Sequence, residues 1–62
     1  MKAGDLGRFR DSKTHFMVVD RLMRSTPVGE MTPHLIIIIN GIHEEVPEFW
    51  LTQHGEVLDE AG

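Results

Sequence analysis

The chain has 62 residues, with ten acidic and six basic side chains, a net charge of −4 and no cysteine. This length allows one domain, residues 1–62, and the lack of cysteine excludes disulfides and thiolate zinc sites. A chain this short buries only about 60% of the surface that its unfolded form exposes. A histidine metal site or self-association is therefore needed as further support, and we expect self-association.

Basic and acidic residues are segregated along the chain. Residues 1–24 contain all six basic residues and three acidic ones, which gives a net charge of +3. Residues 25–62 contain seven acidic residues and no Lys or Arg, a net charge of −7. Either both halves are solvated surface, or the basic edge of one subunit meets the acidic edge of another. A nucleic-acid binder is more typically basic overall.

Targeting signals are not evident in this sequence. No apolar run approaches the roughly 18 residues that a membrane span needs, and residues 1–6 lack the apolar core of a signal peptide. We therefore expect a protein of the cytosol, or of a particle assembled there, with no membrane partner.

The first half of the chain predicts two strands and a loop. A short strand over 6–10 is followed by a polar turn at 11–13, a long strand over 14–24 and a Pro- and Gly-containing loop over 25–33. Alternation in the long strand places Phe16, Val18 and Leu22 on one face and Met17, Val19 and Met23 on the other. In the first strand, Gly7 predicts a bulge or a close backbone approach.

Asn40-Gly41 is the strongest local signal, because a type I′ hairpin turn needs positive φ at both of its central positions. The predicted cross-strand pairs are Ile39 with Ile42, Ile38 with His43, Ile37 with Glu44, Ile36 with Glu45, and Leu35 with Val46. The face that carries Leu35, Ile37 and Ile39 is predicted to point into the core. Glu44 is the one charged residue on that face. Ile36 and Ile38 then face outward.

The proline after the hairpin ends the strand pairing, because it has no N–H to donate. Residues 47–51 fit a single 3₁₀ turn that places Phe49 or Trp50 on the end of a barrel. A connector over 52–55, a short last strand over 56–58 and a polar tail over 59–62 complete the chain. This order of elements predicts an all-β fold, a small barrel.

The order of elements resembles the SH3-like barrel, a fold that hosts many unrelated functions. The segments GDLGRFR, IIINGIHEEVPEFWL and EVLDEA are similar to those of small SH3-like proteins of tailed bacteriophages, cyanophages included. The resemblance covers nearly the whole chain and implies a five-stranded barrel with one 3₁₀ turn, located in the host cytoplasm or the virion. The stretch 39–42 is also similar to the second motif of Sm-like proteins, whose rings assemble through strand edges and bind RNA. Because a strand turn is predicted directly at residues 4–5, we expect the N-terminal helix of that family to be missing.

The outward isoleucines predict a protein interface, because monomers rarely expose large apolar patches. Cover by the loop over 25–33 is the alternative. We expect a homo-oligomer, or docking of the chain on a larger phage structural protein. The predicted interface residues are Ile36, Ile38, Met17, Val19 and the anchor Trp50, with Arg21, Arg24, Glu45 and Glu48 setting the orientation.

Nucleic-acid binding is the alternative function. Arg8, Phe9, Arg10 and Lys13 would form a basic stripe with an aromatic ring at its centre, as in single-strand binders. Arg21 and Arg24 would extend this stripe.

Catalytic and metal signatures are weak. The four histidines do not share a metal-ligand spacing, and no cysteine assists them. The carboxylates lack an evident cleft that would raise the pKa of one of them. We therefore predict no enzyme activity and no cofactor.

Overall fold

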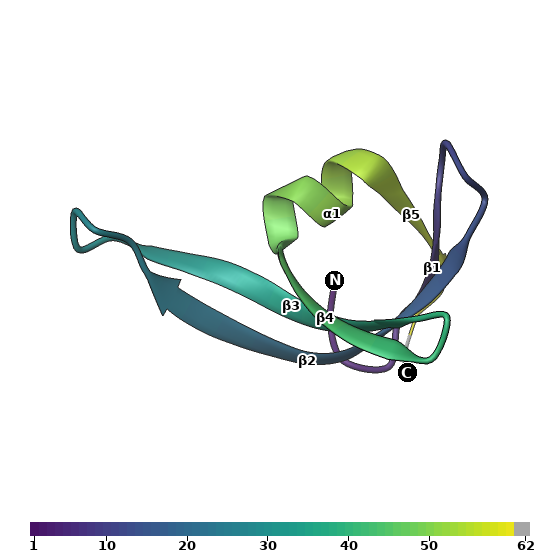
Figure 1. The fold of residues 1–62 in the computed structure, drawn as a ribbon, viewed down its shortest axis with the longest axis horizontal. Coiled ribbons are helices and arrows are strands. Elements are labelled where there is room, and N and C mark those ends of the chain that lie inside the picture. The colour runs from purple at the N-terminus through teal and green to yellow at the C-terminus, as the bar shows by residue number, and fades with distance from the viewer. Residues whose placement is uncertain (61–62) are drawn as a thin grey trace.

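The computed structural model describes residues 1–60, so residues 61 and 62 of the predicted domain and polar tail lie outside the described residues. Five strands and one helix follow one another along the chain (Figure 1). They are β1 (Leu6–Phe9), β2 (His15–Ser25), β3 (Met31–Ile39), β4 (Ile42–Pro47), α1 (Glu48–His54) and β5 (Gly55–Asp59).

The strands form one antiparallel sheet in the order β4-β3-β2-β1-β5, which confirms the all-β prediction with five strands. The sheet curves, and α1 connects its two edge strands, β4 and β5 (Figure 1). Within residues 1–60 no pairing joins β4 to β5. Closure of the sheet into a barrel therefore stays a prediction.

The β3–β4 hairpin agrees with the predicted turn and register. Asn40 and Gly41 have φ values of 51° and 77°, as a type I′ turn requires. All five predicted cross-strand pairs are present, from Ile39 with Ile42 to Leu35 with Val46. Glu44 lies opposite the buried Ile37, but its own side chain is exposed because β4 is an edge strand.

The predicted 3₁₀ turn and connector are wrong, because an α-helix occupies residues 48–54. Pro47 provides an extended N-cap, with φ of −62° and ψ of 138°, and Glu48 places a carboxylate in the first turn. Gly55 ends the helix and donates its backbone N–H to the carbonyl of Leu51. The last strand accordingly begins at Gly55.

The predicted loop over 25–33 is shorter in the structure, because β2 extends to Ser25 and β3 begins at Met31. Pro33 lies within β3, opposite Met23. A proline is tolerated there because β4 pairs no further along β3 than His34, which leaves that edge of β3 free.

A bulge in β2 corrects the predicted alternation of its faces. The register to β3 shifts between Val18 and Asp20, so Val19 is an extra residue. Beyond the bulge, Arg21 lies opposite the buried Leu35, and Leu22 moves to the opposite face. Leu22 therefore does not share the face of Val18.

Within residues 1–60, five apolar side chains are almost fully buried and form the core: Phe16, Val18, Leu35, Ile37 and Leu51. Gly7 is needed beside them, because a Cβ at this position would lie 2.3 Å from Cζ of Phe16. This contact confirms the predicted close backbone approach. The core is small and links β2, β3 and α1.

Candidate interaction surfaces

The outer face of the sheet carries a row of apolar side chains. Met17 pairs with Leu6 on one side and with Ile38 on the other. Residues directly opposite each other in neighbouring strands point to the same side of a sheet. Leu6 and Met17 are 39% and 41% exposed, and Ile38 is half-buried. We call these residues, together with the half-buried Ile36, the outer patch.

The predicted interface is only partly assembled by the fold. Ile38 and Met17 come together as predicted, whereas Ile36 lies between Asp20 on β2 and Glu45 on β4. Val19 is taken out of the regular alternation by its bulge. Leu6 was not among the predicted interface residues, because the sequence alone does not give the register between the first two strands.

A charged network borders the outer patch. Arg24 makes a bidentate pair with Glu45, at 2.5 Å from Nη2 to Oε1 and 2.8 Å from Nε to Oε2. The Nδ1 atom of His34 lies 2.9 Å from the same Glu45 Oε2. The hydrogen bond from Arg24 is the main reason that the pKa of Glu45 falls to about 2. The two predicted orienting residues on this face thus pair with each other.

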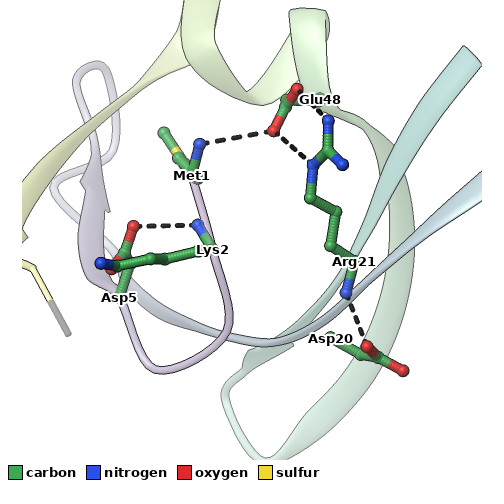
Figure 2. A network of polar contacts seen from close by, with 6 residues as sticks. All are labelled: Met1, Lys2, Asp5, Asp20, Arg21 and Glu48. Atoms are coloured by element: carbon green, nitrogen blue, oxygen red, sulfur yellow. Dashed lines mark hydrogen bonds and ion pairs between the residues drawn. The ribbon is translucent and has the colours of Figure 1, made fainter. Parts of the chain in front are cut away.

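The other two orienting residues pair on the inner face (Figure 2). The Nε atom of Arg21 lies 3.3 Å from Oε2 of Glu48, and the amino group of Met1 is 3.3 Å from the same oxygen. The hydrogen bond from Arg21 lowers the pKa of Glu48. This network joins the N-terminal segment, β2 and the first turn of α1.

The arginines of the predicted nucleic-acid stripe also have partners within the chain. Nη2 of Arg8 is 2.7 Å from Oε1 of Glu56, and this bond lowers the pKa of the glutamate. Nη1 of Arg10 donates to the carbonyl of Gln53 at 2.6 Å, near the C-terminus of α1. Lys13 lies in the turn after β1, with φ of 61°.

Part of the segregated charge is therefore paired within one chain. The antiparallel sheet places β1 beside β5, and the long β2 reaches residues of β4 and α1. Each of the four arginines donates a hydrogen bond to a residue of the acidic half. These bonds within the chain account for part of the charge segregation that suggested contacts between subunits.

Of the two adjacent aromatic residues, Trp50 packs on neighbouring rings and is 38% exposed, and Phe49 is the more exposed of the two. The Trp50 ring meets Phe9 edge-on at 5.9 Å and His54 at 4.7 Å between ring centroids. Phe9 in turn lies 5.0 Å from Phe16 of the core. Phe49 is 67% exposed. Phe49 thus offers a partner more ring surface than Trp50 does, and the role of Trp50 as an anchor stays a prediction.

A protruding arm is the surface that sequence reasoning missed. Residues 22–34 form the end of the β2–β3 hairpin, contain no buried residue and extend beyond the rest of the fold (Figure 1). We call this segment the arm. The arm was not predicted because residues 25–33 were interpreted as a loop. The apolar residues Met23, Val28 and Met31 could have indicated an exposed apolar surface there.

An open hollow lies where the base of the arm meets α1. Its volume is about 410 Å³, and its lining consists of Pro33, Glu48, Phe49, Thr52 and Gln53. The exposed Phe49 ring gives it an apolar wall. Among residues 1–60, no group of three or more metal-ligating side chains is found.

No helix in the described part of the chain is long and apolar enough to cross a membrane. Comparison of the chain with protein-family models, curated proteins and solved structures finds no match. The resemblance to SH3-like phage proteins and to Sm-like proteins therefore stays a prediction.

Proposed function

We propose that the chain is a non-enzymatic assembly or adaptor module that buries its outer patch against another protein. That protein is a further copy of the chain or a larger virion protein, on which the chain docks as an accessory subunit. The phage context of this proposal rests on the resemblance of the sequence segments alone.

The observation that carries the proposal is the register that places Leu6, Met17 and Ile38 side by side on three neighbouring strands. A fully buried aliphatic side chain contributes about 1.5 to 3 kcal/mol relative to an exposed one. A half-buried side chain has only its remaining exposed area to bury, so its contribution to binding a partner is smaller than this. A row of them, bordered by the Arg24–Glu45 pair, has the apolar centre and polar rim of a small interface.

Nucleic-acid binding is the weaker alternative. Phosphate binding needs positive charge that is free to neutralise it, whereas Arg8 and Arg10 donate to Glu56 and to a helix carbonyl. If nucleic acid were the ligand, affinity would fall steeply with salt, and replacing both arginines by serine would abolish it.

The test compares Ile38→Glu with the matched control His15→Glu. Both substitutions place a carboxylate on the outer face, but His15 is exposed and lies outside the outer patch. We expect Ile38→Glu to lower the mass of the self-associated protein, measured by light scattering on a gel-filtration column, or to abolish capture of virion proteins. We expect His15→Glu to leave both unchanged. A folded Ile38→Glu protein with unchanged mass and unchanged capture contradicts the proposal.

A further inference from the structure

The arm carries a second apolar surface, on the opposite side of the sheet from the outer patch. Met23 pairs with Pro33, and Ser25 pairs with Met31, in register with Arg21 and the buried Leu35. These residues therefore face the side on which the core and α1 lie. We call the following residues the arm surface: Met23, Val28, Met31, Pro33 and Phe49.

The arm surface is more exposed than the outer patch. Val28 at the tip is 80% exposed, and Met31 is 59% exposed. The turn at the tip is closed by backbone hydrogen bonds, because the N–H of Thr26 donates to the carbonyl of Glu30 at 2.7 Å. The N–H of Gly29 donates back to the carbonyl of Thr26 at 2.9 Å. The arm thus presents an apolar tip on a closed turn, and its base carries the open hollow.

The spacing of tip and hollow suits two antiparallel copies of the arm. Val28 lies in the turn at the tip of the arm, and Pro33 is the third residue of β3 and lines the hollow at the base, so tip and hollow lie at the two ends of the arm. If two arms stack face to face and antiparallel, the tip of each lies over the hollow of the other. The two-fold axis then passes beside Met31, so the two Met31 side chains meet. Such a contact is isologous, because each copy offers the same surface to the other.

We propose that two copies of this chain associate through their arm surfaces, each placing Val28 into the hollow between Pro33 and Phe49 of the other. This interface differs from the outer patch and does not depend on the proposed function. A second copy is the occupant that the geometry favours, since one chain supplies both the projecting tip and the hollow that receives it.

The available area also agrees with a second copy. With roughly 200 Å² for each large side chain, the exposed fractions of Met23, Val28, Met31 and Phe49 amount to about 500 Å² of apolar area. A standard interface buries about 800 Å² on each partner, of which about 60% is non-polar. The arm surface therefore matches the apolar share of one side of a small dimer. Dimerisation would also add to a small core, which in the described part of the chain has five buried apolar side chains.

The experiment uses charge at the expected two-fold axis. Met31→Lys and Met31→Glu are made separately, and the mass of each protein is measured by sedimentation across a range of concentrations. We expect the wild-type chain to dimerise with a dissociation constant on the order of micromolar, the weak end for an interface of this size. Each variant alone should dimerise at least about tenfold more weakly, because two like charges meet at the axis.

Mixing the two variants should restore the dimer, because Lys then meets Glu. Thr32→Glu is the matched control, since it places the same charge on the opposite face of the same strand. It should leave the wild-type association unchanged. Met31 contributes nothing to the core, so these variants should fold as the wild type does.

Each other outcome overturns the inference. A wild-type chain that is monomeric at all concentrations excludes the dimer and leaves only docking on a larger protein for the outer patch. A dimer that Ile38→Glu breaks and Met31→Lys does not assigns self-association to the outer patch instead. A dimer that both Met31 variants weaken but their mixture does not restore rules out the antiparallel arrangement of the arms.

Discussion

The outer patch and the arm surface are both apolar, but they differ in what lies behind them. Ile36 and Ile38 alternate along β3 with the buried Leu35 and Ile37, and this part of the strand is paired on both sides. The arm consists of two strands, and none of its residues is buried. A substitution in the outer patch therefore disturbs a strand that the core needs. A substitution in the arm changes association with little effect on the core.

The same contrast applies to local stability. Regions with few buried apolar contacts open at low free energy, whereas core strands open only when the whole protein unfolds. We therefore expect the arm to exchange its amide protons faster than the part of β3 between residues 35 and 39. The arm is then the part of the chain whose order depends most on a partner.

The largest expected effect is loss of the core under α1. Leu51→Ala removes a side chain that is fully buried among Phe16, Val18 and the strand β3 residues. Such a truncation costs about 2 to 5 kcal/mol, which is a large share of the stability of a domain of this size. Urea unfolding followed by circular dichroism should show an almost complete loss of the folded state. Met31→Ala in the arm is the control, and a loss as large as that of Leu51→Ala would contradict the contrast.

Alanine substitution of the two adjacent aromatic residues should give the next largest effect on stability. Trp50→Ala removes a partly buried ring that packs on Phe9 and His54, so we expect it to destabilise the fold by about 2 kcal/mol, roughly half the cost of a core ring. Phe49→Ala removes an exposed ring and should change stability by less than about 0.5 kcal/mol. Association through the arm surface should be weakened more by Phe49→Ala than by Trp50→Ala, because only Phe49 belongs to that surface. Equal destabilisation by both variants would contradict this assignment of the rings.

The sequence predicted the hairpin best, because a type I′ turn fixes register by itself. Asn40-Gly41 determined which isoleucines face the core, and all five predicted pairs are present. The prediction weakened where register depends on tertiary packing. No local signal marks the bulge at Val19, so the faces of Leu22 and Met23 were exchanged.

Other features depended on contacts between distant parts of the chain. Sequence segregation of charge suggested pairing between subunits, but the strand order brings Arg8 to Glu56 and Arg24 to Glu45 within one chain. The row of Leu6, Met17 and Ile38 likewise depends on two registers that no turn signal specifies. The length of α1 was predicted too short, as a single 3₁₀ turn, because Pro47 was interpreted only as the end of a strand and not also as the start of a helix.

The smallest effect concerns the ionic link between the arm and the body of the sheet. Arg24 lies on the arm and Glu45 on β4, and their hydrogen bond holds the pKa of Glu45 at about 2, below its ordinary value of 4.5. A lowered folded-state pKa contributes stability above the unfolded pKa, and this contribution is lost as pH falls through the folded pKa. The link should therefore weaken between about pH 4.5 and pH 2.

Hydrogen exchange can measure this link in the arm separately from the body. We expect Glu45→Gln to speed exchange in the arm at neutral pH and to leave β1 and β5 unchanged, because the pair is exposed and of small energy. Since the pairs Arg8–Glu56 and Arg21–Glu48 remain, the variant should still lose some stability on acidification. Glu44→Gln, next to Glu45 but on the opposite face of β4, is the matched control. If both variants speed arm exchange equally, the arm is not held by the Arg24–Glu45 pair, and its apolar surface alone would determine its order.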